Sequence, residues 1–125
     1  MFLLSIMDYD FEGEFSYLNQ TYASVNFRLE REVYEIEGNK HGIPVSLEKR
    51  RDAVDVLARC CEGFLNRMPN DLKTSDRKRV LSTLEVIGGL LRRNPDELRA
   101  SKRGGHIVEV IDKLFEKDPA CIFIS

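Results

Sequence analysis

Apolar side chains in the first third of the chain recur at steps of three and four residues between Asp10 and Glu37. This spacing places them on one face of an α-helix. The members of this stripe are Phe11, Phe15, Leu18, Tyr22, Val25, Leu29, Val33 and Ile36. The pattern predicts either one long helix or two helices that meet between Asn19 and Ser24, where residues that favour helices are scarce. Gly38 is suited to the position that follows the last turn.

A second helix is predicted from about Leu47 to Met68, after turn-forming residues at 38–44. Ser46 is placed to cap its N-terminus, and Pro69 closes it. Its apolar stripe consists of Leu47, Val54, Leu57, Cys61, Phe64 or Leu65, and Met68. Cys60 and Cys61 flank this stripe, so we expect both to act as small buried hydrophobic residues.

A third helix follows a polar loop, with Thr74 or Ser75 as its predicted cap. One face of it carries Val80, Leu84, Ile87 and Leu91, widened by Leu81 and Leu90. Gly88 and Gly89 interrupt this apolar stretch, and each costs a helix about 1 kcal/mol relative to alanine. The glycine pair therefore indicates a kink or the close approach of a neighbouring helix.

A short fourth helix is expected from Asn94 to about Arg103. Asn94 has the chemistry of a cap, Pro95 suits the first turn, and Glu97 stands where a side chain reaches back to the cap. The glycines at 104–105 are expected to end it.

A fifth amphipathic helix is predicted after these glycines, ending at 118–119. Its apolar residues are Ile107, Val108, Ile111, Leu114 and Phe115. The tail at 120–125 is apolar and β-branched, which suits either a strand paired with residues 2–6 or an extended segment packed on the core.

The predicted fold is therefore all-α, with about five helices in one compact domain over residues 1–125 and at most a short strand pair at the termini. The hydrophobic fraction of 42% is sufficient for a core in a chain of 125 residues. The predicted core consists of Leu18, Val25, Leu29, Val54, Leu57, Phe64, Leu84, Ile87, Leu91, Ile111 and Leu114.

The three cysteines are too few and too unevenly spaced for a disulfide framework, which favours a reducing compartment. The apolar residues at 1–7 lack a basic flank, and the segment is shorter than a signal peptide or a membrane span. These features predict a cytoplasmic protein that does not associate with membranes.

Charge is distributed unevenly, although the net charge of the whole chain is only −2. From Asp8 to Glu37 there are eight acidic and two basic residues, whereas from Lys73 to Arg103 there are nine basic and four acidic residues. Such asymmetry is typical of a surface that attracts an oppositely charged partner, and equally of solvated helix faces that differ in sign.

Four glutamates gather near the end of the first predicted helix: Glu30, Glu32, Glu35 and Glu37. Negative charge at a helix C-terminus is unfavourable, so local folding does not explain them. We expect them to bind a cationic surface of another protein. The alternative is that Arg28, Arg31 or the basic residues of 73–103 neutralise them within the chain.

The basic residues form an alternative binding patch for nucleic acid. The candidates are Arg77, Lys78, Arg79, Arg92, Arg93, Arg99, Lys102 and Arg103. The overall acidity of the chain and the lack of aromatic side chains in this stretch argue against nucleic acid. Arg92, Arg93, Lys102 and Arg103 also suit helix C-termini for electrostatic reasons.

Catalytic and metal-binding patterns are not visible in the sequence. Catalysis requires a nucleophile with a base, paired carboxylates or ligands at diagnostic spacing. The only histidines, His41 and His106, stand beside glycines and at no zinc-like spacing from a cysteine. We therefore expect no enzymatic activity, no metal and no cofactor.

The order of residues from Val80 to Pro119 resembles an armadillo repeat over about one third of the chain. In that family paired leucines end one helix, Asn-Pro starts a short helix, and Gly-Gly-Ile leads into a longer apolar helix. The matching residues are Leu90, Leu91, Asn94, Pro95, Gly104, Gly105 and Ile107. His106 and Ile107 depart from the Ile-Pro that commonly follows the glycines, and such stacks need about three units for stability.

The resemblance implies a minimal helical stack with a protein-binding surface and no catalysis. These observations together predict a small non-catalytic protein-binding factor. An immunity or antitoxin protein that binds and neutralises a basic toxin is one class, and an adaptor or regulatory subunit is another. Nucleic-acid binding through residues 73–103 is the third hypothesis.

Overall fold

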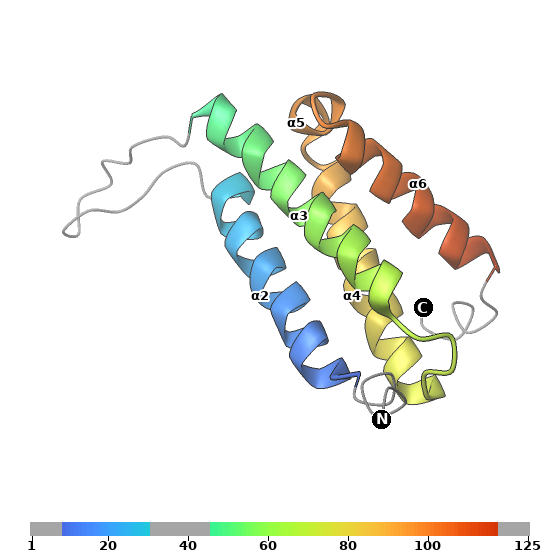
Figure 1. Cartoon of the computed structure of the whole chain (residues 1–125). Coiled ribbons are helices and arrows are strands. Elements are labelled where there is room, and N and C mark those ends of the chain that lie inside the picture. The colour runs from blue at the N-terminus through green and yellow to red at the C-terminus, as the bar shows by residue number, and fades with distance from the viewer. Residues whose placement is uncertain (1–8, 31–45, 118–125) are drawn as a thin grey trace.

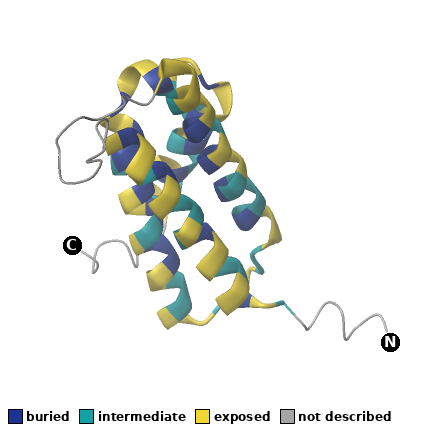
Figure 2. Ribbon diagram, turned by 90° about the vertical axis from the view of Figure 1, so that its left-hand side faces the viewer, coloured by how far each residue is buried: buried dark blue, intermediate teal, exposed yellow. Residues whose placement is uncertain are grey.

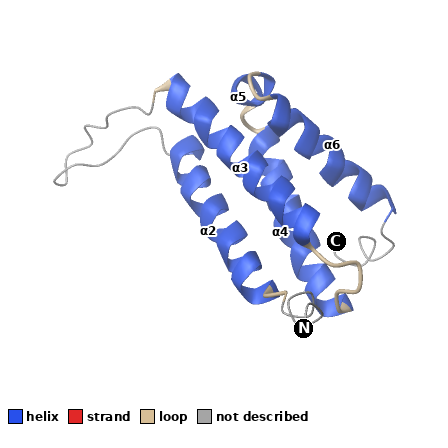
Figure 3. Ribbon diagram, in the orientation of Figure 1, coloured by secondary structure: helices blue, strands red, loops and turns tan. Residues whose placement is uncertain are grey.

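The computed structural model describes residues 9–30 and 46–117. Five helices occupy them: α2 (Phe11–Glu30), α3 (Leu47–Arg67), α4 (Thr74–Arg92), α5 (Pro95–Arg99) and α6 (Lys102–Lys117). These two ranges contain helices and short loops and no strand (Figure 3). The prediction of an all-α fold with five helices is confirmed, whereas the predicted terminal strand pair lies outside the described residues.

The four long helices form a compact bundle in which α3 runs alongside α2 (Figure 1). Helix α2 packs against α3 and α4, and α6 packs against the same two helices from the other side. Helices α2 and α6 therefore occupy opposite corners of the bundle. The short α5 lies at one end, where it contacts α3, α4 and α6.

The core lies along the inner faces of these helices (Figure 2). Ten of the predicted core residues are buried: Leu18, Val25, Leu29, Val54, Leu57, Phe64, Leu84, Ile87, Leu91 and Ile111. Leu114 is only partly buried, because it lines an apolar groove of about 170 Å³ where α6 meets the α3–α4 loop. Leu47, which was placed on the predicted stripe of α3, is 49% exposed because it begins the helix beyond the core.

Helix α2 is continuous across the predicted break between Asn19 and Ser24. The amide nitrogen of Asn19 donates to the carbonyl oxygen of Phe15 at 2.8 Å, and its amide oxygen accepts from Thr83 at 3.4 Å. Because this polar side chain finds partners on α2 and α4, it does not interrupt the helix. Residues 31–37, the predicted continuation, lie outside the described residues.

The start of α3 confirms the prediction, and the start of α4 does not. The Ser46 hydroxyl accepts a hydrogen bond from the backbone N–H of Lys49 at 3.3 Å, which caps α3. In α4 the cap position is Lys73, and Thr74 already lies within the helix. This helix starts without a side-chain cap. Asp76 in its first turn stabilises the start instead, because it supplies negative charge at the positive end of the helix dipole.

The predicted boundary between the fourth and fifth helices is also wrong. Helix α5 ends at Arg99, and the glycines at 104–105 lie in the first turn of α6 instead of ending a helix. The hydroxyl of Ser101 accepts from the N–H of Gly104 at 2.9 Å and so caps α6. A Cβ atom on Gly104 would lie 3.0 Å from the Val54 side chain, so this glycine allows α3 and α6 to approach closely.

The Gly88–Gly89 pair lies within a continuous α4, and Gly88 is buried. A Cβ atom on Gly88 would lie 3.6 Å from the side chain of Ile111, which is an ordinary van der Waals distance. Gly88 therefore lies beside α6, but the two helices are not so close there that a side chain is excluded, so the predicted close approach is not observed.

A buried ion pair joins the helices near α5. The Arg50 Nε atom donates to Glu97 at 2.6 Å, and the two side chains are only 11% and 7% exposed. Other guanidinium nitrogens of Arg50 donate to the Leu29 carbonyl at 3.1 Å and to the Asn94 amide oxygen at 3.2 Å. The Asn94 amide nitrogen donates to the Leu90 carbonyl at 2.9 Å.

The predicted capping pair of Asn94 and Glu97 is therefore wrong. Neither side chain caps α5, because both are drawn to Arg50 on α3. Pro95 does occupy the first turn, as predicted. Arg50 thus links α2, α3, α5 and the α4–α5 connection.

Acid should weaken the fold through this ion pair. Burial alone would raise the pKa of Glu97, but its hydrogen bond with Arg50, the local backbone and the nearby arginine charges outweigh burial and lower it. Because the pKa of Glu97 is lower in the folded state, its ionised carboxylate stabilises the fold at pH values above 4.5, the ordinary pKa of a glutamate. This stabilisation is lost as the pH falls from 4.5 through the lowered pKa of the folded state.

Urea denaturation at neutral pH and at pH values below 4.5 measures this loss. The Glu97→Gln variant is the control, because it lacks the titrating group. We expect the wild-type free energy of unfolding to fall more steeply with acid than that of the variant. Equal slopes for the two proteins would show that Glu97 is not the responsible group.

Candidate functional site

The acidic cluster proposed from the sequence is represented by Glu30 alone among the described residues. A Glu30 carboxylate oxygen accepts from the Nε atom of Arg93, the residue that follows α4, at 2.8 Å. Glu32, Glu35 and Glu37 lie outside the described residues. Glu30 is therefore neutralised within the chain by a basic residue of 73–103, which was the alternative to binding a partner.

Reversing the charge of Glu30 should slightly destabilise the fold. Its side chain is 38% exposed and that of Arg93 is 56% exposed, so solvent weakens the pair. We expect Glu30→Lys to lower the free energy of unfolding by at most about 1 kcal/mol. Combining it with Arg93→Glu should restore much of the loss in urea denaturation. A double variant no more stable than the single one would contradict the pairing.

The basic patch is divided among three helices and largely neutralised. Ion pairs form between Arg79 and both Glu12 and Asp76, Arg92 and Asp112, Arg93 and Glu30, Arg99 and Asp96, and Arg103 and Glu62. The remaining candidates are Arg77, which donates to the Asn70 carbonyl at 3.4 Å, and the exposed Lys78 and Lys102. Since five of its eight members hold carboxylates, the patch is a weaker site for phosphates than the sequence suggests.

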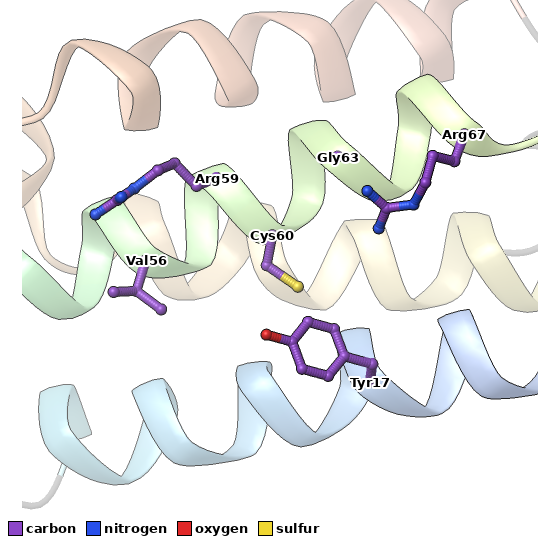
Figure 4. A pocket seen from close by; sticks show the side chains of 6 residues that line it. All are labelled: Tyr17, Val56, Arg59, Cys60, Gly63 and Arg67. Atoms are coloured by element: carbon purple, nitrogen blue, oxygen red, sulfur yellow. The ribbon is translucent and has the colours of Figure 1, made fainter.

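A different surface stands out between α2 and α3, and we call it the Tyr17 groove. Its lining residues are Tyr17, Val56, Arg59, Cys60, Gly63 and Arg67, and its volume is about 350 Å³ (Figure 4). Tyr17 reaches across from α2 toward Cys60, whereas the other five residues belong to α3. Tyr17 is 60% exposed and Val56 is 43% exposed, and both belong to the few large hydrophobic side chains that are exposed in the described part of the chain.

Helical periodicity explains why these side chains face outward. Tyr17 directly precedes the buried Leu18, and Val56 directly precedes the buried Leu57. A step of one residue turns a side chain by about 100° around a helix, so both lie off the buried stripes. The sequence contains this signal as apolar residues outside the predicted stripes, whereas the charged clusters used to predict a site do not include them.

The two cysteines next to each other on α3 have different environments. Cys61 is buried, and burial raises the pKa of its thiol to about 12, with a smaller effect from the neighbouring Cys60. The prediction of a small buried hydrophobic residue therefore holds for Cys61. Cys60 packs against the core but is only partly buried and lines the groove, so that prediction holds only in part at position 60.

The described part of the chain contains no group of three histidine, cysteine or acidic residues arranged to hold a metal ion. The groove offers a phenol, a thiol and two guanidinium groups, and none of its six lining residues is a histidine or a carboxylate that would act as a base. Of the two histidines, His106 is exposed on α6, and His41 lies outside the described residues.

Comparisons with protein-family models, with curated proteins and with solved structures found no match. Among the described helices, none combines the length and apolar character needed to cross a membrane. The functional interpretation therefore rests on the geometry and chemistry of the groove.

Proposed function

We propose that this chain is a small non-catalytic protein-binding factor that contacts its partner through the Tyr17 groove. The observation that carries the proposal is the exposure of Tyr17 and Val56 beside two arginines. Tyrosine and arginine are enriched where protein interfaces derive most of their binding energy. A tyrosine ring supplies apolar contact area, and its hydroxyl group stays available for a hydrogen bond.

An immunity or antitoxin protein that neutralises a toxin is the class we favour, and an adaptor or regulatory subunit is the second. The net charge of −6 over residues 8–37 supports a partner whose surface outside the groove is basic, because opposite charges accelerate association. Glu32, Glu35 and Glu37 remain proposed contacts for that partner. The armadillo-like order from Val80 to Pro119 also supports protein binding, as part of the same proposal.

Replacing Tyr17 by alanine should weaken partner binding by about tenfold or more, because the ring contributes much of the exposed contact area. The partner is first recovered from extracts of the native cell on the immobilised wild-type chain, and its affinity is then measured by calorimetry. Val86→Ala is the matched control, since Val86 is 48% exposed on α4 and does not line the groove.

Unchanged affinity of the Tyr17 variant would remove the groove from the proposal. Recovery of nucleic acid without a protein partner would favour the alternative that uses residues 73–103. Retention on single-stranded DNA at low salt, and the slope of its loss with added salt, would then count the phosphate contacts.

A further inference from the structure

We propose that the Tyr17 groove receives an acidic segment of the partner, in which two carboxylates flank an apolar side chain. This inference rests on the proposed function and specifies the chemistry of what enters the groove. Arg59 and Arg67 stand on either side of Cys60 and Gly63, with the Tyr17 ring opposite (Figure 4). The groove thus has an apolar centre and a cation toward each end.

The two arginines already hold carboxylates of this chain, but these carboxylates lie deeper than the arginines. Arg59 pairs with Asp55 at 2.9 Å, and Arg67 pairs with Glu14 on α2. The arginine side chains are 56% and 54% exposed, whereas those of Asp55 and Glu14 are 33% and 26% exposed. A partner therefore meets the arginine side chains more readily than the carboxylates that they hold.

These pairs also hold the arginines in position. These ion pairs are made by one nitrogen of each guanidinium group, Nη2 in Arg59 and Nε in Arg67. A guanidinium group has five N–H donors, so donors remain for a second carboxylate. The Nη1 atom of Arg67 lies 3.0 Å from the point where a Cβ atom of Gly63 would stand, so the absence of a side chain there leaves room for the guanidinium group.

The spacing of the arginines defines the length of the bound segment. Arg67 lies eight positions after Arg59 on α3, which corresponds to a rise of about 12 Å along the helix axis between their Cα atoms. A partner helix lying along α3 matches this distance when its carboxylates are seven or eight residues apart. An apolar side chain halfway between them would then contact the Tyr17 ring and Cys60.

Nucleic acid is the competing anion, and the surroundings of the groove disfavour it. Glu14 belongs to the first turn of α2 and lies beside the Arg67 end of the groove. A strand with a phosphate on every nucleotide would meet this carboxylate as well as the two arginines. A protein segment avoids that repulsion because it presents carboxylates only where the arginines stand.

A phage-displayed library of random 12-residue peptides tests the inference independently of the natural partner. The wild-type chain should enrich peptides in which Asp or Glu flank an apolar residue. Against the Arg59→Gln/Arg67→Gln variant, the affinity of the enriched peptides should fall by about tenfold or more. The control is Lys113→Gln/Lys117→Gln, which removes the same charge from exposed positions of α6 at the opposite corner of the bundle. Thermal melting confirms that each variant is folded.

Enrichment of basic peptides, of no peptide, or of peptides that bind both double variants equally would overturn the inference. Single-stranded DNA is measured in parallel, and a loss of DNA binding in the arginine variant without acidic peptide binding would overturn it in favour of nucleic acid. A natural partner that binds through Tyr17 but inserts a neutral or basic segment would leave the proposed function standing and remove this inference alone.

Discussion

Replacing Arg50 by methionine is expected to lower the free energy of unfolding by about 3–5 kcal/mol, the largest loss we predict for a polar residue of this chain. The substitution keeps most of the side-chain volume but removes the charge. Glu97, with a side chain only 7% exposed, would then be an ionised carboxylate without its partner at 2.6 Å. The Leu29 carbonyl and the Asn94 amide would lose donors at the same time.

The double variant Arg50→Met/Glu97→Met separates the cost of an unpaired charge from the net contribution of the pair. Replacing both partners of a buried pair by apolar residues is often close to neutral. We therefore expect the double variant to recover part of the stability lost in Arg50→Met, as measured by urea denaturation at neutral pH. A double variant at least as unstable as the single one would show that the unpaired Glu97 is not the cause.

Truncating Leu84 to alanine is expected to cost about 2–5 kcal/mol, because it removes buried methyl groups and leaves a cavity in the core. Leu84 is completely buried on α4 and belongs to the main hydrophobic cluster of the bundle. Its apolar neighbours come from helices that are far apart in the sequence, so the loss should reduce the stability of the whole bundle.

Val86→Ala is the matched control for this substitution. Val86 lies two residues further along the same helix but is 48% exposed. Surface substitutions usually change stability by no more than about 0.5 kcal/mol. Denaturation of the two variants should therefore differ clearly, and similar losses for both would contradict the position of α4 in the bundle.

Periodicity predicted the helices well because burial of one face is a local property of the sequence. The stripe through Leu18 and Val25 indicated α2, and the hydroxyl of Ser46 indicated the start of α3. Leu114 was predicted to be in the core and is only partly buried, since the pattern does not show where the bundle ends.

The errors concern contacts between residues that are distant in the sequence. Asn94 and Glu97 have the spacing of a capping pair, but Arg50, 47 residues before Glu97, attracts both side chains. Gly104 is a residue type that often follows the end of a helix. It lies inside α6, however, where α3 packs closely against it. A local pattern contains no information about such a neighbour.

The candidate site was only partly predictable for the same reason. Glu30 and Arg93 were both proposed as binding residues on the basis of local charge, and the fold pairs them with each other. Tyr17 and Val56 lie outside the apolar stripes, so their exposure was readable from the sequence. Their proximity to Arg59 and Arg67 required the packing of α2 against α3.

Site-specific photo-cross-linking in the native cell tests the central claim most directly. A photoreactive amino acid is placed at Val56 in the Tyr17 groove or, as control, at Val86 on α4, two positions of similar exposure. We predict a discrete cross-linked protein from position 56 that is absent from position 86 and is lost when Tyr17→Ala is added. Equal cross-linking from both positions, or a product at position 56 that persists without the Tyr17 ring, would contradict protein binding through this groove.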